Sequence, residues 1–260
     1  MQSRARFASW PDAVLAGSLA SLALLAWWSL WLWRHSPEGH WLMHGSSPPP
    51  MAMAHPLRFM AIFTTGWTLM TIAMMLPTSI PLLVLFHRMI RGKCGAWRLL
   101  ALVIAGYLAI WASIGAVLQA TIWMLYAGVG RVLLPGAARW FASAALLAVA
   151  GLFQFSKLKY ACLDKCRSPM SFLVSHWRGG SEPTQALRLG AVHGLFCVGC
   201  CWSLMALMFV VGAGSLTGML ALGVVMALEK NFAWGRRLGA PLGWLLLAGA
   251  AAAATVGFRA

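Results

Sequence analysis

The stretch LRLGAVHGLFCVGCCWSLMALMFVVG, from Leu187 to Gly212, decides the class of this chain because it is long, apolar and almost uncharged. Arg188 is its only charged residue. A bilayer core of about 30 Å takes about 20 helical residues to cross, so this run predicts a transmembrane helix. Within it, an imidazole and three thiols stand where leucine would be less costly in lipid.

The rest of the chain has the same character. Of its 260 residues, 61% are hydrophobic and only 10% are charged, whereas soluble domains average about 25% charged residues. Seven stretches are candidate spans: 13–33, 58–86, 99–126, 139–156, 187–212, 215–229 and 240–258. We therefore predict an all-α polytopic membrane helix bundle with about seven transmembrane helices, in a single domain over residues 1–260.

The charge of the chain indicates its orientation. It has 20 Lys and Arg against 5 Asp and Glu, a formal net charge of +15. With the N-terminus in the cytoplasm, 15 of the basic residues fall on the inner side and 5 on the outer side. This positive-inside pattern predicts an N-in, C-out topology. We interpret the basicity as contact with the lipid bilayer and its anionic head groups, and expect no nucleic-acid partner.

The outer loop at 34–58 is rich in His and Met. It contains His35, His40, Met43, His44, Met51, Met53 and His55. In an extended chain Met51, Met53 and His55 share one face. Thioether ligands select Cu(I), and unlike thiols they form no disulfides in an oxidising compartment. The loop therefore predicts accessory copper ligands, with a non-binding polar loop as the alternative.

The second span carries further methionines and a predicted kink. Met70 and Met74 lie on one helical face, whereas Met75 lies off it. They are either packing residues or a thioether relay for a metal. Pro77, with a second proline four residues on, removes helix hydrogen bonds. We expect a kink there and freed carbonyl groups, one of them at about Ala73, that need partners.

Two thiol groups precede the fifth span in the inner loop at 157–186. Cys162 and Cys166 are one helical turn apart. Lys159, Lys165 and Arg167 surround them in sequence, and cationic neighbours favour the thiolate that binds metals or attacks disulfides. A lone Cys-x3-Cys pair is weaker than the paired motifs of zinc sites, so chance spacing is the alternative.

The strongest candidate site is in the fifth span itself. Four side chains lie within an arc of about 100°: His193, Cys197, Cys200 and Cys201. By the charge count they lie near the reducing cytoplasmic end, so the thiols should be free. One straight helix cannot bring all four groups to one ion, so Cys162, Cys166 or another span would complete a site. The alternative is that the cysteines pack as small hydrophobic residues.

Glu229 and Lys230 follow the sixth apolar run. Charged residues at this depth are costly unless paired or solvated. An interface anchor is one interpretation. A proton carrier and an ion-pair latch against a basic loop are the alternatives.

Five strings together resemble a bacterial family of predicted metal-binding integral membrane proteins. They are AMMLP (73–77), CLDKCRSP (162–169), WRGG (177–180), HGLFCVGCCWSLM (193–205) and MALEKN (226–231). The resemblance covers about residues 58–231. It implies a bacterial cytoplasmic (inner) membrane and a metal-binding role for six residues: Cys162, Cys166, His193, Cys197, Cys200 and Cys201.

The leading functional prediction is a membrane protein that handles copper, by binding, trafficking or transport, with a metal donor or acceptor protein as its partner. Zinc and iron are alternative metals for His and Cys ligands. A membrane thiol–disulfide oxidoreductase and a metal-insertion or assembly factor are the alternative functions. No phosphate-binding loop is present, and no carboxylate pairs with a His and a Ser for hydrolysis, which favours a non-enzymatic role.

Overall fold

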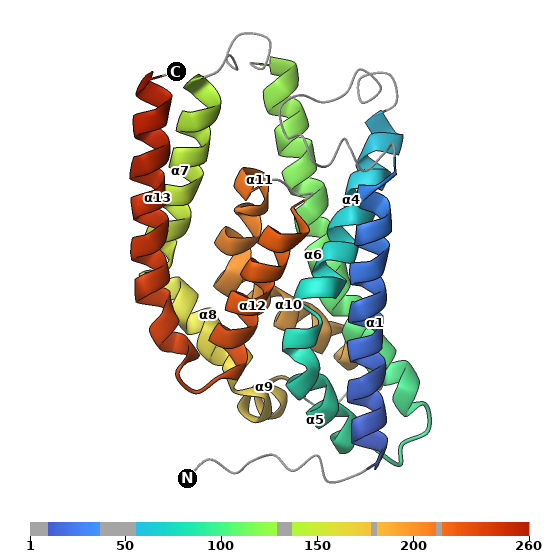
Figure 1. Cartoon of the computed structure of the whole chain (residues 1–260). Coiled ribbons are helices and arrows are strands. Elements are labelled where there is room, and N and C mark those ends of the chain that lie inside the picture. The colour runs from blue at the N-terminus through green and yellow to red at the C-terminus, as the bar shows by residue number, and fades with distance from the viewer. Residues whose placement is uncertain (1–9, 37–55, 129–136, 178–180, 212–214, 260) are drawn as a thin grey trace.

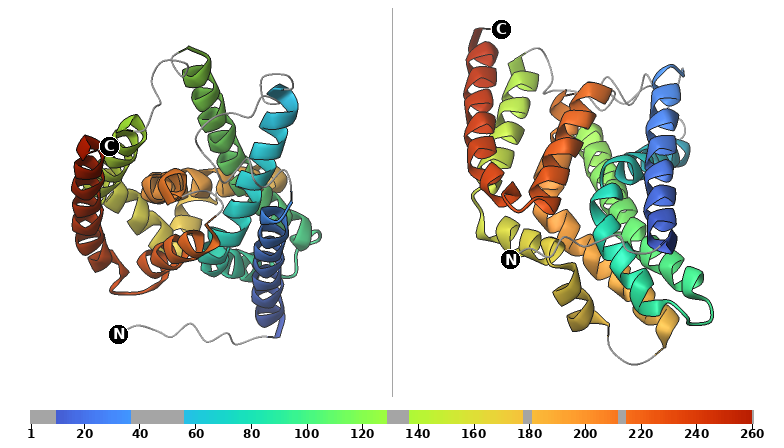
Figure 2. Two further views of the ribbon diagram at one scale, coloured as in Figure 1. Left: turned by 45° about the horizontal axis from the view of Figure 1, so that its top comes forward. Right: turned by 60° about the horizontal axis from the view of Figure 1, so that its bottom comes forward.

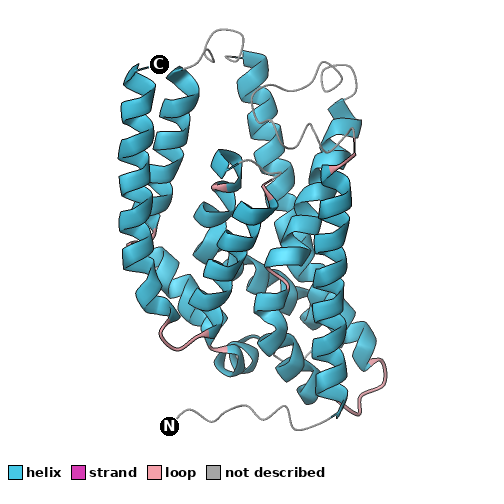
Figure 3. Cartoon of the chain, viewed as in Figure 1, coloured by secondary structure: helices cyan, strands magenta, loops and turns pink. Residues whose placement is uncertain are grey.

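The computed structural model describes residues 10–36, 56–128, 137–177, 181–211 and 215–259. Within these ranges the chain forms helices and connecting turns with no strand, as Figure 3 shows, so the all-α prediction is confirmed. The elements in chain order are α1 (Trp10–Arg34), α4 (Pro56–Met74), η1 (Pro77–Ser79), α5 (Ile80–Ile90), α6 (Ala96–Gly128), α7 (Ala137–Phe153), α8 (Lys157–Arg167), α9 (Pro169–His176), α10 (Glu182–Ala206), α11 (Met208–Val211), α12 (Leu216–Asn231), η2 (Gly235–Leu238) and α13 (Gly239–Arg259).

Four stretches are long and apolar enough to cross a membrane: Trp10–Arg34, Ala96–Thr121, Glu182–Ala206 and Gly235–Phe258. Two bent helix pairs raise the number to as many as six if each pair is one span. Helix α12 has 16 residues, fewer than the roughly 20 that a straight crossing takes. The predicted count of seven spans therefore stays a prediction.

Helix α10 is the centre of the bundle. It lies between the α7/α13 pair and the α1/α4 pair (Figure 1, Figure 2). Of its most apolar window, 56% is buried, against 22–33% in the other three spans. Close packing against α6 requires Gly190, because a Cβ there would lie 1.9 Å from the Val103 carbonyl oxygen. Small residues at such crossings let two helix backbones approach.

The predicted kink in the second span is present between α4 and α5. The two halves, Met60–Met74 and Pro77–Ile90, meet at 45°. The freed Ala73 carbonyl accepts a hydrogen bond of 3.1 Å from the indole of Trp27 in α1. The backbone N–H groups of Met75 and Leu76 both donate to Thr71. These backbone N–H and carbonyl groups at the break are therefore paired. Met75 follows the last residue of the regular helix α4.

A buried carboxylate ties α1 to the end of α5. Asp12 accepts hydrogen bonds from Arg88 at 2.9 Å and Arg91 at 2.8 Å. The first turn of α1 is thereby fixed at the same end of the bundle as the turn between α5 and α6.

Candidate metal centre

Three sulfur atoms surround one buried ammonium group in the middle of the bundle. The Lys230 Nζ lies 2.9 Å from the Cys197 Sγ, 3.8 Å from the Cys201 Sγ and 3.7 Å from the Met75 Sδ. The Cys201 Sγ lies 3.7 Å from the Met75 Sδ. We call Met75, Cys197 and Cys201 the three-sulfur cluster. All three side chains are buried.

Each member of the cluster is positioned by a different local feature. Cys197 and Cys201 are one turn apart on α10, and the Cys201 thiol donates to the Cys197 carbonyl at 2.9 Å. Met75 directly follows the end of α4, and its Sδ lies 3.7 Å from the Cys201 Sγ. Lys230 comes from the last turn of α12. From α6, the Tyr107 hydroxyl lies 3.1 Å from the Cys197 Sγ. The three-sulfur cluster therefore joins two segments of the chain, and its neighbours Lys230 and Tyr107 come from two more.

The other two predicted thiols lie on the opposite flank of the cysteine run of α10. Cys166 of α8 packs against the core that contains Cys200, and the Cys200 thiol donates to the Cys197 carbonyl at 3.1 Å. Cys162 lies against Gly199, where an added Cβ would be only 2.5 Å from the Cys162 Sγ. The structure thus brings the two sequence-distant cysteine groups together. All six cysteines of the chain are free thiols.

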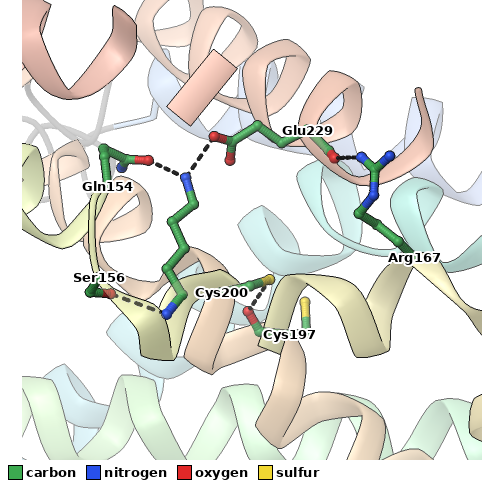
Figure 4. Close-up of polar contacts among 7 residues, drawn as sticks. Gln154, Ser156, Arg167, Cys197, Cys200 and Glu229 are labelled. Atoms are coloured by element: carbon green, nitrogen blue, oxygen red, sulfur yellow. Dashed lines mark hydrogen bonds and ion pairs between the residues drawn. The ribbon is translucent and has the colours of Figure 1, made fainter. Parts of the chain in front are cut away.

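A buried ion pair fixes α8 against α12. The Lys159 ammonium donates to the Glu229 carboxylate at 2.6 Å, and their side chains are 0% and 3% exposed. Lys159 also donates to the Gln154 side chain; Figure 4 labels both of its acceptors, Gln154 and Glu229. Arg167 donates to the Glu229 carbonyl and, at 3.0 Å, to that of Ala233. Of the interpretations of Glu229, the structure shows the ion-pair latch.

This latch changes the expected surroundings of the inner thiols. Lys159 and Arg167 were expected to surround Cys162 and Cys166, but both cations are directed to oxygen acceptors (Figure 4). Lys165 is exposed. A buried cation finds a stronger partner in a carboxylate or carbonyl than in a thiol, which explains the difference.

His193 is buried but is not part of the three-sulfur cluster. Its Nε2 lies 3.1 Å from the Ser79 hydroxyl, and its ring lies between those of Tyr107 and Phe172. The Nδ1 atom has no hydrogen-bond partner within the described ranges. The imidazole is thus held one turn before Cys197, where it packs against aromatic rings.

The structure places the cysteines of the cluster well inside α10. Because α10 begins at Glu182 rather than at the predicted 187, Cys197 lies about 22 Å from the start of the helix at 1.5 Å per residue. The expected position near the cytoplasmic end of the span stays a prediction. The thiols face the middle of the bundle.

The accessory ligands divide into two groups. Met70 and Met74 are buried, and Met74 packs against α12 at Gly223. The outer-loop residues His40, His44, Met51, Met53 and His55 lie outside the described residues.

Sequence reasoning missed Met75, Tyr107 and Lys230 as neighbours of the thiols. The position of Met75 two residues before Pro77, where the helix cannot continue regularly, was the signal available for it.

Among the residues that the structure describes, no group of three or more His, Cys, Asp or Glu side chains is arranged to hold a metal ion. The three-sulfur cluster contains two such residues, because its third donor is a methionine thioether. Two thiols and a thioether are soft donors, which bind Cu(I) and other soft ions in preference to hard ones.

Fold and site together define an apolar helical bundle with a buried cluster of soft sulfur donors. A family model described as PpoB2, copper chaperone, matches residues 64–253, so the chain belongs to the PpoB2 copper chaperone family. The matched region runs from α4 into α13 and contains the whole three-sulfur cluster, whereas α1 and the outer loop precede it. No curated protein and no solved structure matches the chain.

Proposed function

We propose that this chain is a membrane-embedded copper chaperone that binds Cu(I) at Met75, Cys197 and Cys201 and delivers it to a partner protein. The observation that carries the proposal is the convergence of these three sulfur atoms on one cation, the Lys230 ammonium, at 2.9–3.8 Å. Side chains from two separate segments already face one positively charged group, and a soft monovalent metal ion is a second cation that these donors suit.

Copper is favoured over zinc and iron by the donor set. Zinc sites in proteins use four ligands, mostly thiolate, imidazole or carboxylate. Here the nearest imidazole, that of His193, is held by Ser79, and the third donor is a thioether. Thioether with thiolate selects Cu(I).

Cys166 and Cys200, with Cys162 beside them, form a second set of thiols for the same ion. Because they lie on the flank of α10, their thiols can replace the ligands of the three-sulfur cluster around the copper ion one at a time. In this proposal the metal leaves the three-sulfur cluster toward α8 by stepwise ligand exchange. His193 would then act as a packing residue.

The wider setting belongs to the same proposal. The chain is a single multi-pass domain in a bacterial inner membrane, with seven spans, N-in and C-out. The outer loop would capture or release copper through His40, His44, Met51, Met53 and His55, and the stripe of Met70 and Met74 would relay the ion toward the cluster. Four apolar helices that can span a membrane support this setting.

Copper binding is tested with the purified full chain in detergent. The copper content is measured by elemental analysis and by competition with a Cu(I) chelator. Both measurements compare the parent with Cys197→Ser/Cys201→Ser. The matched control is Cys94→Ser, since Cys94 is an exposed thiol. We expect the double variant to lose the tightly bound copper and the control to retain it. Retention in the double variant contradicts the site, and loss in Met51→Ala/Met53→Ala alone would place the ion in the outer loop.

A membrane thiol–disulfide oxidoreductase is the second candidate, favoured by the packing of Cys166 against the core that contains Cys200. Exchange between such thiols passes through a disulfide state. Mass labelling of free thiols with and without reductant separates the two functions. An oxidoreductase yields a trapped Cys166–Cys200 disulfide, whereas a chaperone yields six free thiols in both samples.

A further inference from the structure

Lys230 is a buried cation with no carboxylate partner among the residues that the structure describes. Its contacts are the three sulfur atoms of the cluster and the Thr78 hydroxyl at 3.4 Å. Every carboxylate in the described ranges has another basic partner, and none forms an ion pair with Lys230. The pairs are Asp12 with Arg88 and Arg91, Asp164 with Arg236, Glu182 with Lys93, and Glu229 with Lys159.

A buried charge is costly unless an opposite charge compensates it. The groups in contact with Lys230 that can carry negative charge are the thiols of Cys197 and Cys201, together with Cys200 and Tyr107 nearby. A thiol that binds a metal does so as the thiolate. A loaded cluster therefore contains two negative sulfurs, one neutral thioether and the positive ammonium of Lys230.

The sum of these charges depends on the metal ion. With a monovalent ion the loaded site is neutral, whereas with a divalent ion it carries one net positive charge in a buried, low-dielectric position. We propose that Lys230 makes this site selective for monovalent soft ions. Its fixed positive charge balances the site when the ion is monovalent and leaves an uncompensated positive charge when the ion is divalent. This inference rests on the proposed function, because it assigns selectivity to the same site.

The arrangement allows Lys230 to remain in place beside the ion. Its flexible stem comes from α12, whereas the sulfur donors come from α10 and from the break after α4, so the ammonium can shift along the cluster without moving a ligand. In this proposal the long, flexible Lys side chain shifts away from the sulfurs by a small distance when the ion binds. Lys230 then donates to the bound thiolates.

The test uses Ag(I) and Cd(II), two redox-inert soft ions of different charge. The full chain in detergent is equilibrated with both, and the metal-to-protein ratios are measured by elemental mass spectrometry. The ultraviolet absorption of cadmium–thiolate bonds gives a second readout. The variants are Lys230→Met and Lys230→Gln, which remove the charge, and Lys230→Arg, which keeps it. Lys157→Met is the control, since Lys157 is exposed.

We expect the preference for Ag(I) over Cd(II) to fall by about 100-fold in Lys230→Met and Lys230→Gln, a size in line with measured couplings between close buried charges. Lys230→Arg and the control should keep the parent preference. Equal preference in parent and charge-free variants overturns the inference, as does a shift of the same size in Lys230→Arg.

The parent alone provides a further check if the charge-free variants do not fold. A parent that binds Ag(I) and Cd(II) equally well contradicts the role of Lys230 but leaves the metal site intact. A parent that binds neither ion contradicts the proposed function itself. The two failures are thereby distinguished.

Discussion

The buried ion pair between α8 and α12 gives the sharpest prediction on stability. Glu229→Gln removes the negative charge that faces Lys159 at 2.6 Å. Breaking a buried pair costs about 3–5 kcal/mol because it leaves one charge uncompensated. Since the Gln154 side chain remains as an acceptor for Lys159, we expect a loss near the lower end, about 3 kcal/mol of unfolding free energy.

The assay is reversible denaturant unfolding of the full chain in mixed micelles, followed by circular dichroism. Replacing both partners, as in Lys159→Met/Glu229→Leu, removes both charges and should recover most of the loss. Asp164→Asn is the control, because the Asp164–Arg236 pair is about half exposed and such pairs contribute about 0–1 kcal/mol.

Two results would refute this reasoning. One is a cost of less than about 1 kcal/mol for Glu229→Gln, which would mean that water reaches the pair. The other is a double variant whose loss equals the sum of the two single losses, since uncoupled sites add.

Three further predictions test the packing around the cluster. Gly199→Ala places a Cβ 2.5 Å from the Cys162 Sγ and should displace α8, so that maleimide labelling of Cys166 becomes faster; an unchanged labelling rate would argue against it. Trp27→Phe removes the hydrogen bond to the break after α4 and should cost about 1 kcal/mol of unfolding free energy, with no loss of stability as the contrary result. Asp12→Asn weakens two charged hydrogen bonds to the end of α5 and should lower the unfolding free energy by about 2 kcal/mol, measured by the same denaturant unfolding. An unchanged unfolding free energy would show that α1 packs on the bundle through apolar contacts alone.

Much of the fold could be predicted from local sequence. Apolar runs of about 20 residues identify the helices, since in lipid every backbone group must be paired within its segment. The kink at Pro77 and the need of the Ala73 carbonyl for a partner follow from proline chemistry. The partner itself, Trp27, could not be predicted, because it depends on the way α1 packs on α4. The length of α12 likewise leaves its role as a span open.

The candidate site was predictable in its thiols but less so in their neighbours. Helical periodicity places Cys197 and Cys201 on one face, and the structure shows them together. Periodicity also put Met75 off the methionine stripe, and its thioether lies 3.7 Å from the Cys201 thiol, a contact that depends on the packing of the segment after α4 against α10. None of the interpretations of Glu229 and Lys230 (an interface anchor, a proton carrier or an ion-pair latch) placed Lys230 beside the thiols, because the single sequence gives no sign that α12 packs in the centre of the bundle.

The most direct test of the account is X-ray absorption spectroscopy of the chain loaded with one equivalent of Cu(I). The account predicts a copper centre surrounded by sulfur alone, with one sulfur fewer or a weaker sulfur shell in Met75→Leu and loss of the centre in Cys197→Ser/Cys201→Ser. A spectrum dominated by nitrogen or oxygen neighbours, or a sulfur shell that all these substitutions leave unchanged, would contradict it.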